Sequence, residues 1–108
     1  MAETNPAPIP GFEHLWIVIE NGVATVGITQ ETADAAGDFI FVELPEVGRR
    51  VRAGEPLGSV ETTKSIVDIA SPLTAVVAEV NAELGEHPRL LNDDPYRSGW
   101  IVRLRRES

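Results

Sequence analysis

Turn-forming residues interrupt this chain so often that long helices are excluded and only short strands fit between the breaks. The 108 residues include nine glycines and eight prolines, spread along the whole chain. The runs rich in valine and isoleucine that lie between them are 15–20, 23–28, 39–44, 57–61, 65–70, 75–80 and 99–104. Short β-branched runs bounded by turn residues are typical of strands. The pattern therefore predicts a mainly β protein, either a small barrel or a sandwich.

The clearest local signal is a hairpin at Asn21 and Gly22. Both residues tolerate the positive φ angles of a type I′ turn, and β-branched residues flank them on both sides. Farther along, Thr29 can cap a short helix over residues 30–36. Gly37 is expected to end that helix in a left-handed conformation.

Length and composition predict one domain. A chain of 108 residues that is 43% hydrophobic can build one modest core. Residues 1–11 are rich in proline and small polar residues and are expected to form a flexible arm, so the folded domain spans residues 12–108. Cysteine is absent, and the first residues lack the basic and apolar regions of a signal peptide. No apolar run approaches the roughly 20 residues needed to cross a bilayer, so we expect a soluble cytoplasmic protein.

The charge balance excludes some partners. Seventeen acidic residues stand against nine basic ones, a formal net charge of −8. Such a surface repels nucleic acid and anionic lipid, so neither is an expected partner. The basic residues near the C-terminus, Arg103, Arg105 and Arg106, are too few to reverse this.

Self-sufficient catalysis and metal binding are not indicated. His14 and His87 lie far apart, and neither has a second histidine at ligand spacing. Asp93 and Asp94 precede Pro95, which favours a turn over a cation site. No serine has a visible histidine and acid constellation, and the chain has no thiol nucleophile.

The polar break between two strand-like runs contains Lys64, the only lysine in the chain. One hypothesis is a phosphate-binding loop, because the G-x-x-x-x-G-K-[ST] pattern fits from Gly58 to Ser65 with one mismatch. The mismatch is Thr63, which stands where a second glycine would let the backbone wrap a phosphate. A strand-like run also follows where the motif needs the N-terminus of a helix. The phosphate-binding hypothesis is therefore rejected.

Two hypotheses remain for Lys64: a solvated turn residue, or a site of covalent attachment. Most lysines at hairpin tips are simply solvated. A tight turn would also hold the stem of this lysine while leaving its amine within reach of a modifying enzyme. Glu61 and Asp68 flank it at positions −3 and +4, near the bases of the two strands. That arrangement suits a modification tag, and the residues alone leave both hypotheses open.

Five separated segments resemble the H proteins of the glycine cleavage system. In chain order they are GITQETADAAGDFIFVELPEVG, VETTKSIVDIASP, EVNAEL, LLNDDPY and GWIV. Their order and spacing match that family over residues 12–105. The ETTKS segment is also similar to the lysine turn of lipoyl domains in 2-oxoacid dehydrogenase complexes. Biotinyl domains usually place methionine on both sides of the lysine, and Thr63 and Ser65 stand there instead, which disfavours biotin.

The resemblance implies a fold and a modified residue. The fold is a flattened β-barrel, the hybrid of barrel and sandwich, with one or two short helices. The modification is lipoate, joined by an amide to Lys64 by a lipoate ligase or lipoyl transferase. The residues implied to form the tip and an adjacent cleft are Glu61, Thr62, Thr63, Ser65, Asp68, His14 and Leu15.

By the same resemblance, the protein is a monomeric carrier with no catalytic residues. Lipoyl-Lys64 would take an aminomethyl group from the glycine decarboxylase (P protein) to the aminomethyltransferase (T protein). Dihydrolipoyl dehydrogenase (L protein) would then reoxidise the arm. Two alternatives stay open. One is an H-like carrier for lipoate relay or another oxidation pathway, and the other is an unmodified interaction module with the same fold.

The chain departs from the family pattern at Leu15. The family has His-Glu-Trp where this chain has His14, Leu15 and Trp16, and that glutamate helps shelter the charged aminomethyl group in a surface cleft. Leucine cannot accept a hydrogen bond or balance a cation, whereas Asp68, which matches another cleft residue, is kept. We therefore expect Leu15 to lie near the cleft and to weaken it. Most family members also continue through a C-terminal helix beyond the position of Ser108.

Overall fold

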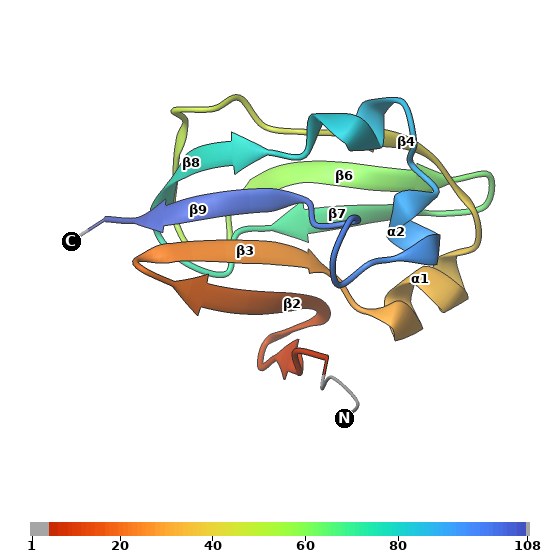
Figure 1. Ribbon diagram of the computed structural model, residues 1–108, viewed down its shortest axis with the longest axis horizontal. Coiled ribbons are helices and arrows are strands. Elements are labelled where there is room, and N and C mark those ends of the chain that lie inside the picture. Colours follow the sequence, from red (N-terminus) through yellow and green to blue (C-terminus); the bar gives the residue numbers. More distant parts are fainter. Residues whose placement is uncertain (1–4, 108) are drawn as a thin grey trace.

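The computed structural model describes residues 5–107, which form two antiparallel β-sheets that share one hydrophobic core (Figure 1). The larger sheet contains, in spatial order, β1 (Pro8–Ile9), β2 (Phe12–Glu20), β3 (Val23–Ile28), β9 (Val102–Arg106), β8 (Ala75–Val80) and β5 (Arg50–Val51). The smaller sheet contains β4 (Phe39–Glu43), β6 (Pro56–Thr62) and β7 (Ile66–Ala70). The helical segments are α1 (Gln30–Ala36), the 3-10 helix η1 (Ala82–Gly85) and α2 (Leu90–Asp93). The expected mainly β architecture with short helices is confirmed.

The hairpin at Asn21 and Gly22 is present and joins β2 to β3. Asn21 has a φ of 52° and Gly22 a φ of 78°, as a type I′ turn requires. The two strands pair along their length, from Glu20 opposite Val23 to Leu15 opposite Ile28. The local prediction holds because the turn chemistry and the flanking β-branched runs specify the same register.

The short helix α1 also has its expected bounds and its expected N-terminal cap. The hydroxyl oxygen of Thr29 accepts a hydrogen bond from the backbone N–H of Thr32 (3.2 Å). Gly37 follows the helix with a φ of 96° and a ψ of −164°. Its positive φ requires glycine as predicted. The ψ lies far from the left-handed helical region, because the chain extends directly into β4 instead of turning back on the helix.

A two-residue strand, β1, precedes the expected domain boundary at Phe12. Residues 1–4 of the predicted arm lie outside the described residues, but Pro8 and Ile9 form β1 and pair with β2. Ile9 is half-buried and packs against the core. Burial of that side chain explains why part of a proline-rich segment joins the sheet.

The last third of the chain differs most from the sequence-based expectation. The final strand was expected from Gly99 and instead begins at Val102. Gly99 is packed so tightly that an added Cβ would lie 2.5 Å from the backbone oxygen of Leu90. The helix α2 was not expected, and Asp93 is its last residue. Asp94 forms the turn that was expected there, since its carboxylate accepts a hydrogen bond from the N–H of Ser98 (3.1 Å).

Side chains from both sheets meet in the core. The inward row of the smaller sheet is Val42, Val60 and Val67, paired across β4, β6 and β7. Val60, at the centre of that row, is completely buried. Gly58, two residues earlier, lets β4 and β6 approach closely, because an added Cβ there would collide with the backbone oxygen of Glu43. Along residues 5–107, no helix is both long and apolar enough to cross a membrane.

Candidate modification site at the β6–β7 turn

The turn between β6 and β7 projects at the end of the molecule where α1 and α2 lie (Figure 1). Thr62 ends β6 and Ile66 begins β7, so Thr63, Lys64 and Ser65 make the turn. Thr63 and Lys64 are exposed. The backbone N–H of Thr62 donates to the carbonyl oxygen of Ser65 (2.9 Å), which closes the turn. The predicted hairpin tip is therefore present with Lys64 at its apex.

The hydroxyl of Thr62 holds the turn together from inside. Its oxygen accepts hydrogen bonds from the backbone N–H groups of Lys64 (3.2 Å) and Ser65 (3.0 Å). The same hydroxyl donates to the carbonyl oxygen of Ala36 at the end of α1 (2.9 Å). Thr62 is only 3% exposed, and its bond to Ala36 is buried, away from competing water. This arrangement fixes the backbone on both sides of Lys64.

A second hydroxyl reinforces the link between the turn and α1. Ser65 also donates to the carbonyl oxygen of Ala36 (3.2 Å), and its oxygen lies 3.2 Å from that of Thr62. The last helical carbonyl groups of any helix lack partners within the helix. At Ala36 the turn supplies those partners, so the position of Lys64 depends on the position of α1.

The stem of Lys64 lies over Gly37. A Cβ added to Gly37 would be 3.0 Å from Cε of Lys64 and 3.8 Å from its Nζ. Any larger residue at this position would therefore displace the stem as well as strain the backbone at a φ of 96°. Within residues 5–107, the amine of Lys64 forms no ion pair and no hydrogen bond. The stem is supported while the amine stays available.

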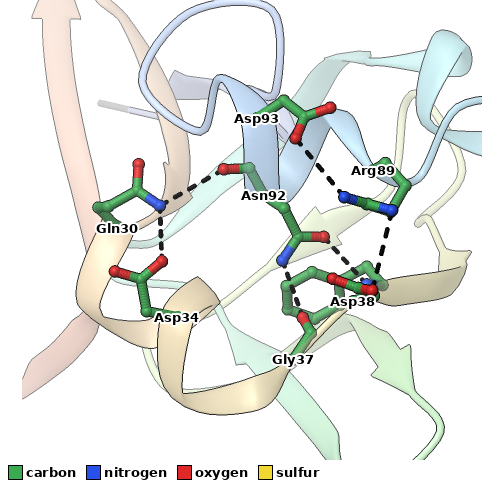
Figure 2. Close-up of polar contacts among 8 residues, drawn as sticks. Gln30, Asp34, Gly37, Asp38, Arg89, Asn92 and Asp93 are labelled. Carbon is green, nitrogen blue, oxygen red and sulfur yellow. Dashed lines mark hydrogen bonds and ion pairs between the residues drawn. The ribbon is translucent and has the colours of Figure 1, made fainter.

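Asn92 in α2 clamps the segment that follows α1, as Figure 2 shows. Its Nδ2 donates to the carbonyl oxygen of Gly37 (2.8 Å), and its Oδ1 accepts from the backbone N–H of Phe39 (3.0 Å). At the other end of α1, the N–H of Gln30 donates to the hydroxyl of Tyr96 (2.9 Å). Asn92 in α2 and Tyr96 after it therefore hold α1 at both ends, and α1 in turn holds the turn that bears Lys64.

Replacing Asn92 with alanine is expected to lower the free energy of unfolding by about 1–3 kcal/mol, because two hydrogen bonds worth about 0.5–1.5 kcal/mol each are lost. The matched control is Asp93→Ala in the same helix. Among residues 5–107, the carboxylate of Asp93 makes only an exposed contact with Arg89 (3.9 Å), worth about 0–1 kcal/mol. Denaturant unfolding of both variants measures the difference. Equal stability of the two variants would contradict the clamp.

The acidic residues and the histidine predicted for the site lie close to β7. Glu61 is half-buried and pairs with Ile66 across the two strands. Asp68 is exposed, and its backbone carbonyl oxygen lies 3.2 Å from Nε2 of His14. The structure thus brings His14 and Asp68 together, although through the backbone of Asp68 and not through its carboxylate.

Leu15 does not line an open cleft, which corrects the expectation from its sequence position. Its side chain is 0% exposed and belongs to the central core, opposite Ile28. Alternate residues of a strand face opposite sides of the sheet, and here Leu15 faces the interior. The weakening of a surface cleft by this leucine therefore has no support, since leucine fills space that is closed to water.

A surface groove lies instead between α1 and β7, beside the turn that bears Lys64. Its volume is about 430 Å³, and its lining residues are Glu31, Thr32, Ala35, Ala36, Ser65 and Val67. Three of these six are alanine or valine. The groove can accept an apolar chain that leaves the turn along the helix surface.

Sequence reasoning missed the residues that support the turn from behind. Asn92 was noticed only as part of the LLNDDPY segment, and no role was inferred for its side chain. Gly37 was expected to end a helix, while its contact with the Lys64 stem was not foreseen. An asparagine next to two aspartates in a short polar segment was the available signal, but its partners lie more than 50 residues away in the sequence.

The part of the chain that the structure describes holds no group of three or more potential metal-ligating side chains.

Comparison with known proteins agrees with this geometry. The family model described as Glycine cleavage H-protein matches residues 11–108. This chain belongs to the glycine cleavage H-protein family. A glycine cleavage system H protein of Rubrobacter xylanophilus is 50% identical over 92 residues, which are 85% of this chain and 73% of that protein. One from Streptomyces coelicolor is 47% identical over 94 residues, or 86% of this chain and 75% of that protein.

A solved structure of the family has the same fold. The crystal structure of a glycine cleavage system H protein from Mycobacterium marinum superimposes with a TM-score of 0.83 at 39% sequence identity. The match covers 88% of this chain and 80% of the other. Both family membership and the fold implied by the resemblance are therefore confirmed.

Proposed function

We propose that the protein is the lipoyl carrier of a glycine cleavage system and that Lys64 bears the lipoyl group. The observation that carries the proposal is the only lysine of the chain at the apex of a fixed turn, with its amine unpaired among residues 5–107. Family membership supports glycine cleavage as the pathway. The alternative of a simple solvated lysine does not explain why the buried Thr62 hydroxyl fixes the backbone around it.

The residues present fit a lipoyl arm. When bound, lipoate would supply a dithiolane that accepts electrons and carries a one-carbon amine group between enzymes. Thr62 and Ser65 hold the turn, and Gly37 leaves room for the lysine stem. Amide formation removes the charge of an amine whose ordinary pKa is about 10.4. A neutral arm can then lie along the alanine-lined groove beside α1 at little desolvation cost.

The carrier itself needs no catalytic residue in this role. It would receive the aminomethyl group at the glycine decarboxylase, deliver it to the aminomethyltransferase and be reoxidised by dihydrolipoyl dehydrogenase. A lipoate ligase or lipoyl transferase would first modify Lys64. Tethering raises the local concentration of the carried group at each partner without chemistry by the carrier. The proposed place of action is the cytoplasm.

Reconstitution tests the proposed function. The lipoylated protein is expected to support release of labelled CO2 from carboxyl-labelled glycine when it is mixed with the decarboxylase, the aminomethyltransferase and the dehydrogenase, with tetrahydrofolate as carbon acceptor and NAD+ as oxidant. The unmodified protein is the control and is expected to give only background release. If the lipoylated protein is also inactive while an authentic H protein works in the same mixture, the carrier serves another oxidation pathway. If protein isolated from its native cell lacks the lipoyl mass, it is an unmodified interaction module.

A further inference from the structure

The outward face of the smaller sheet carries an ordered set of side chains next to Lys64. Pairing places Phe41 opposite Glu61 and Glu61 opposite Ile66, so these three residues form one row across β4, β6 and β7. Adjacent strands lie about 4.8 Å apart, so the row spans about 10 Å. Glu61 precedes Lys64 by three residues and Ile66 follows it by two. The row therefore lies at the base of the turn that bears the lysine.

The two ends of this row are large apolar side chains in contact with water. Phe41 is 57% exposed and Ile66 is 63% exposed. The next row of paired residues points to the opposite face of the smaller sheet and packs in the core; it consists of Val42, Val60 and Val67. The apolar layer of this sheet is therefore on its inner face. Neither Phe41 nor Ile66 is needed to fill the interior. An exposed aromatic residue on a sheet, in one row with an exposed aliphatic residue, can serve as an interface anchor.

Carboxylates lie between these two side chains and along one side of their row. Glu61 lies between them, and the next outward row is Glu43, Ser59 and Asp68. None of the three carboxylates has an ion-pair partner among residues 5–107. Arg49 lines the same surface cavity as Glu43, but its guanidinium donates to the carbonyl oxygen of Pro56 (3.0 Å). The face is thus apolar at two points, and acidic between them and on one side.

We propose that this face, defined by Phe41, Glu61 and Ile66, docks the carrier on the glycine decarboxylase, the enzyme that loads the Lys64 arm, at an apolar depression bordered by arginine and lysine. The proposal rests on the proposed carrier function and names the surface that this function would use. A partner seated on the row lies against the base of the turn, so its active site is within reach of an arm that leaves from the apex. The acidic rim would steer a basic partner and fix its orientation.

The same charges argue against the other possible occupants. An anionic lipid surface would meet Glu43, Glu61 and Asp68 and be repelled. A second copy related by twofold symmetry would bring the same acidic rows face to face, because such an interface uses one patch twice. A basic protein surface is the occupant that gains from both the apolar and the acidic side chains.

The test uses lipoylated protein and the glycine decarboxylase, with three single variants. Phe41→Ser and Ile66→Ser are each expected to raise the KM for the carrier about tenfold or more while kcat stays within about twofold, as for loss of an interface anchor. Ile19→Ser is the matched control, because Ile19 is 52% exposed on β2 and lies outside the row. Its KM is expected to equal that of the unsubstituted protein. Thermal denaturation of each variant establishes that it is folded.

Salt dependence and direct binding complete the test. The KM is expected to rise with ionic strength, and Glu61→Gln is expected to reduce that rise, because charge pairs across an interface are screened by salt.

Unchanged KM values for both Phe41→Ser and Ile66→Ser would overturn the docking surface, as would an equal effect of Ile19→Ser. If the decarboxylase never loads the unsubstituted protein, the proposed function fails, and binding of the same variants to that enzyme then decides the docking proposal. Loss of binding only in Phe41→Ser and Ile66→Ser supports it, and no binding by any form overturns it.

Discussion

Replacing Lys64 with arginine is expected to abolish lipoylation completely and to leave the fold intact. Lys64 is the only lysine in the chain, so the variant has no side-chain amine left to acylate. Arginine keeps the positive charge and a long stem, and its guanidinium is not nucleophilic at neutral pH. Since the lysine amine makes no ion pair among residues 5–107, its loss costs little stability. Intact-mass spectrometry after incubation with lipoate ligase, lipoate and ATP measures the result.

A variant that moves the lysine by one position tests whether the turn geometry matters. Thr63→Lys in the Lys64→Arg background places an exposed amine next to the original site. The hydroxyl of Thr62 fixes the backbone of residue 64, whereas residue 63 makes no hydrogen bond to that hydroxyl. We therefore expect little or no lipoylation of the moved lysine. Lipoyl mass on the single Lys64→Arg variant would overturn the assignment of the site.

Replacing Thr62 with valine is expected to have the largest effect on stability. Valine has nearly the same shape, but it removes the hydroxyl that accepts from the backbone N–H groups of Lys64 and Ser65 and donates to the carbonyl oxygen of Ala36. Three hydrogen bonds worth about 0.5–1.5 kcal/mol each are lost, so we expect a loss of about 3 kcal/mol. For a domain of this size that corresponds to a fall in Tm of roughly 12–24 °C. The turn would also lose its fixed form, so lipoylation should slow at a temperature where the variant is still folded.

Two conservative variants separate the hydrogen bonds from other effects. Thr62→Ser keeps the hydroxyl and removes one methyl group, so most of the stability and the lipoylation rate should remain. Thr63→Val makes the same chemical change as Thr62→Val at the exposed neighbouring position, where a surface substitution should change stability by no more than about 0.5 kcal/mol. Thermal denaturation and initial rates of lipoylation compare the four proteins. If Thr62→Val is as stable as Thr63→Val, the hydroxyl does not organise the turn.

These expectations share one structural cause. Ala36 at the end of α1 accepts hydrogen bonds from the hydroxyls of Thr62 and Ser65, and Asn92 holds the residues that follow α1. The turn is thus supported by a helix that is itself supported by α2. A lysine on such a support leaves the protein from a fixed backbone position beside α1.

Local sequence determined the turns and helix caps whose hydrogen bonds and backbone angles involve only neighbouring residues. The turn at Asn21 and Gly22 follows from positive φ angles that few other residues adopt, and α1 follows from the cap at Thr29. Lys64 could be placed at a hairpin tip because a polar break separates two strand-like runs. Each of these predictions depends on neighbours in the chain, so tertiary contacts reinforce them and do not decide them.

Tertiary structure alone decided the parts that depend on strand pairing and on distant partners. Leu15 was expected at a cleft, and its place in the sheet instead turns its side chain into the core. Asn92 acquires its role from Gly37 and Phe39, more than 50 residues away. The row on the smaller sheet exists only because β4, β6 and β7 pair in one register, and a shift of one residue would turn those side chains to the other face. Such contacts arise from the packing of whole elements, which no local pattern of residues encodes.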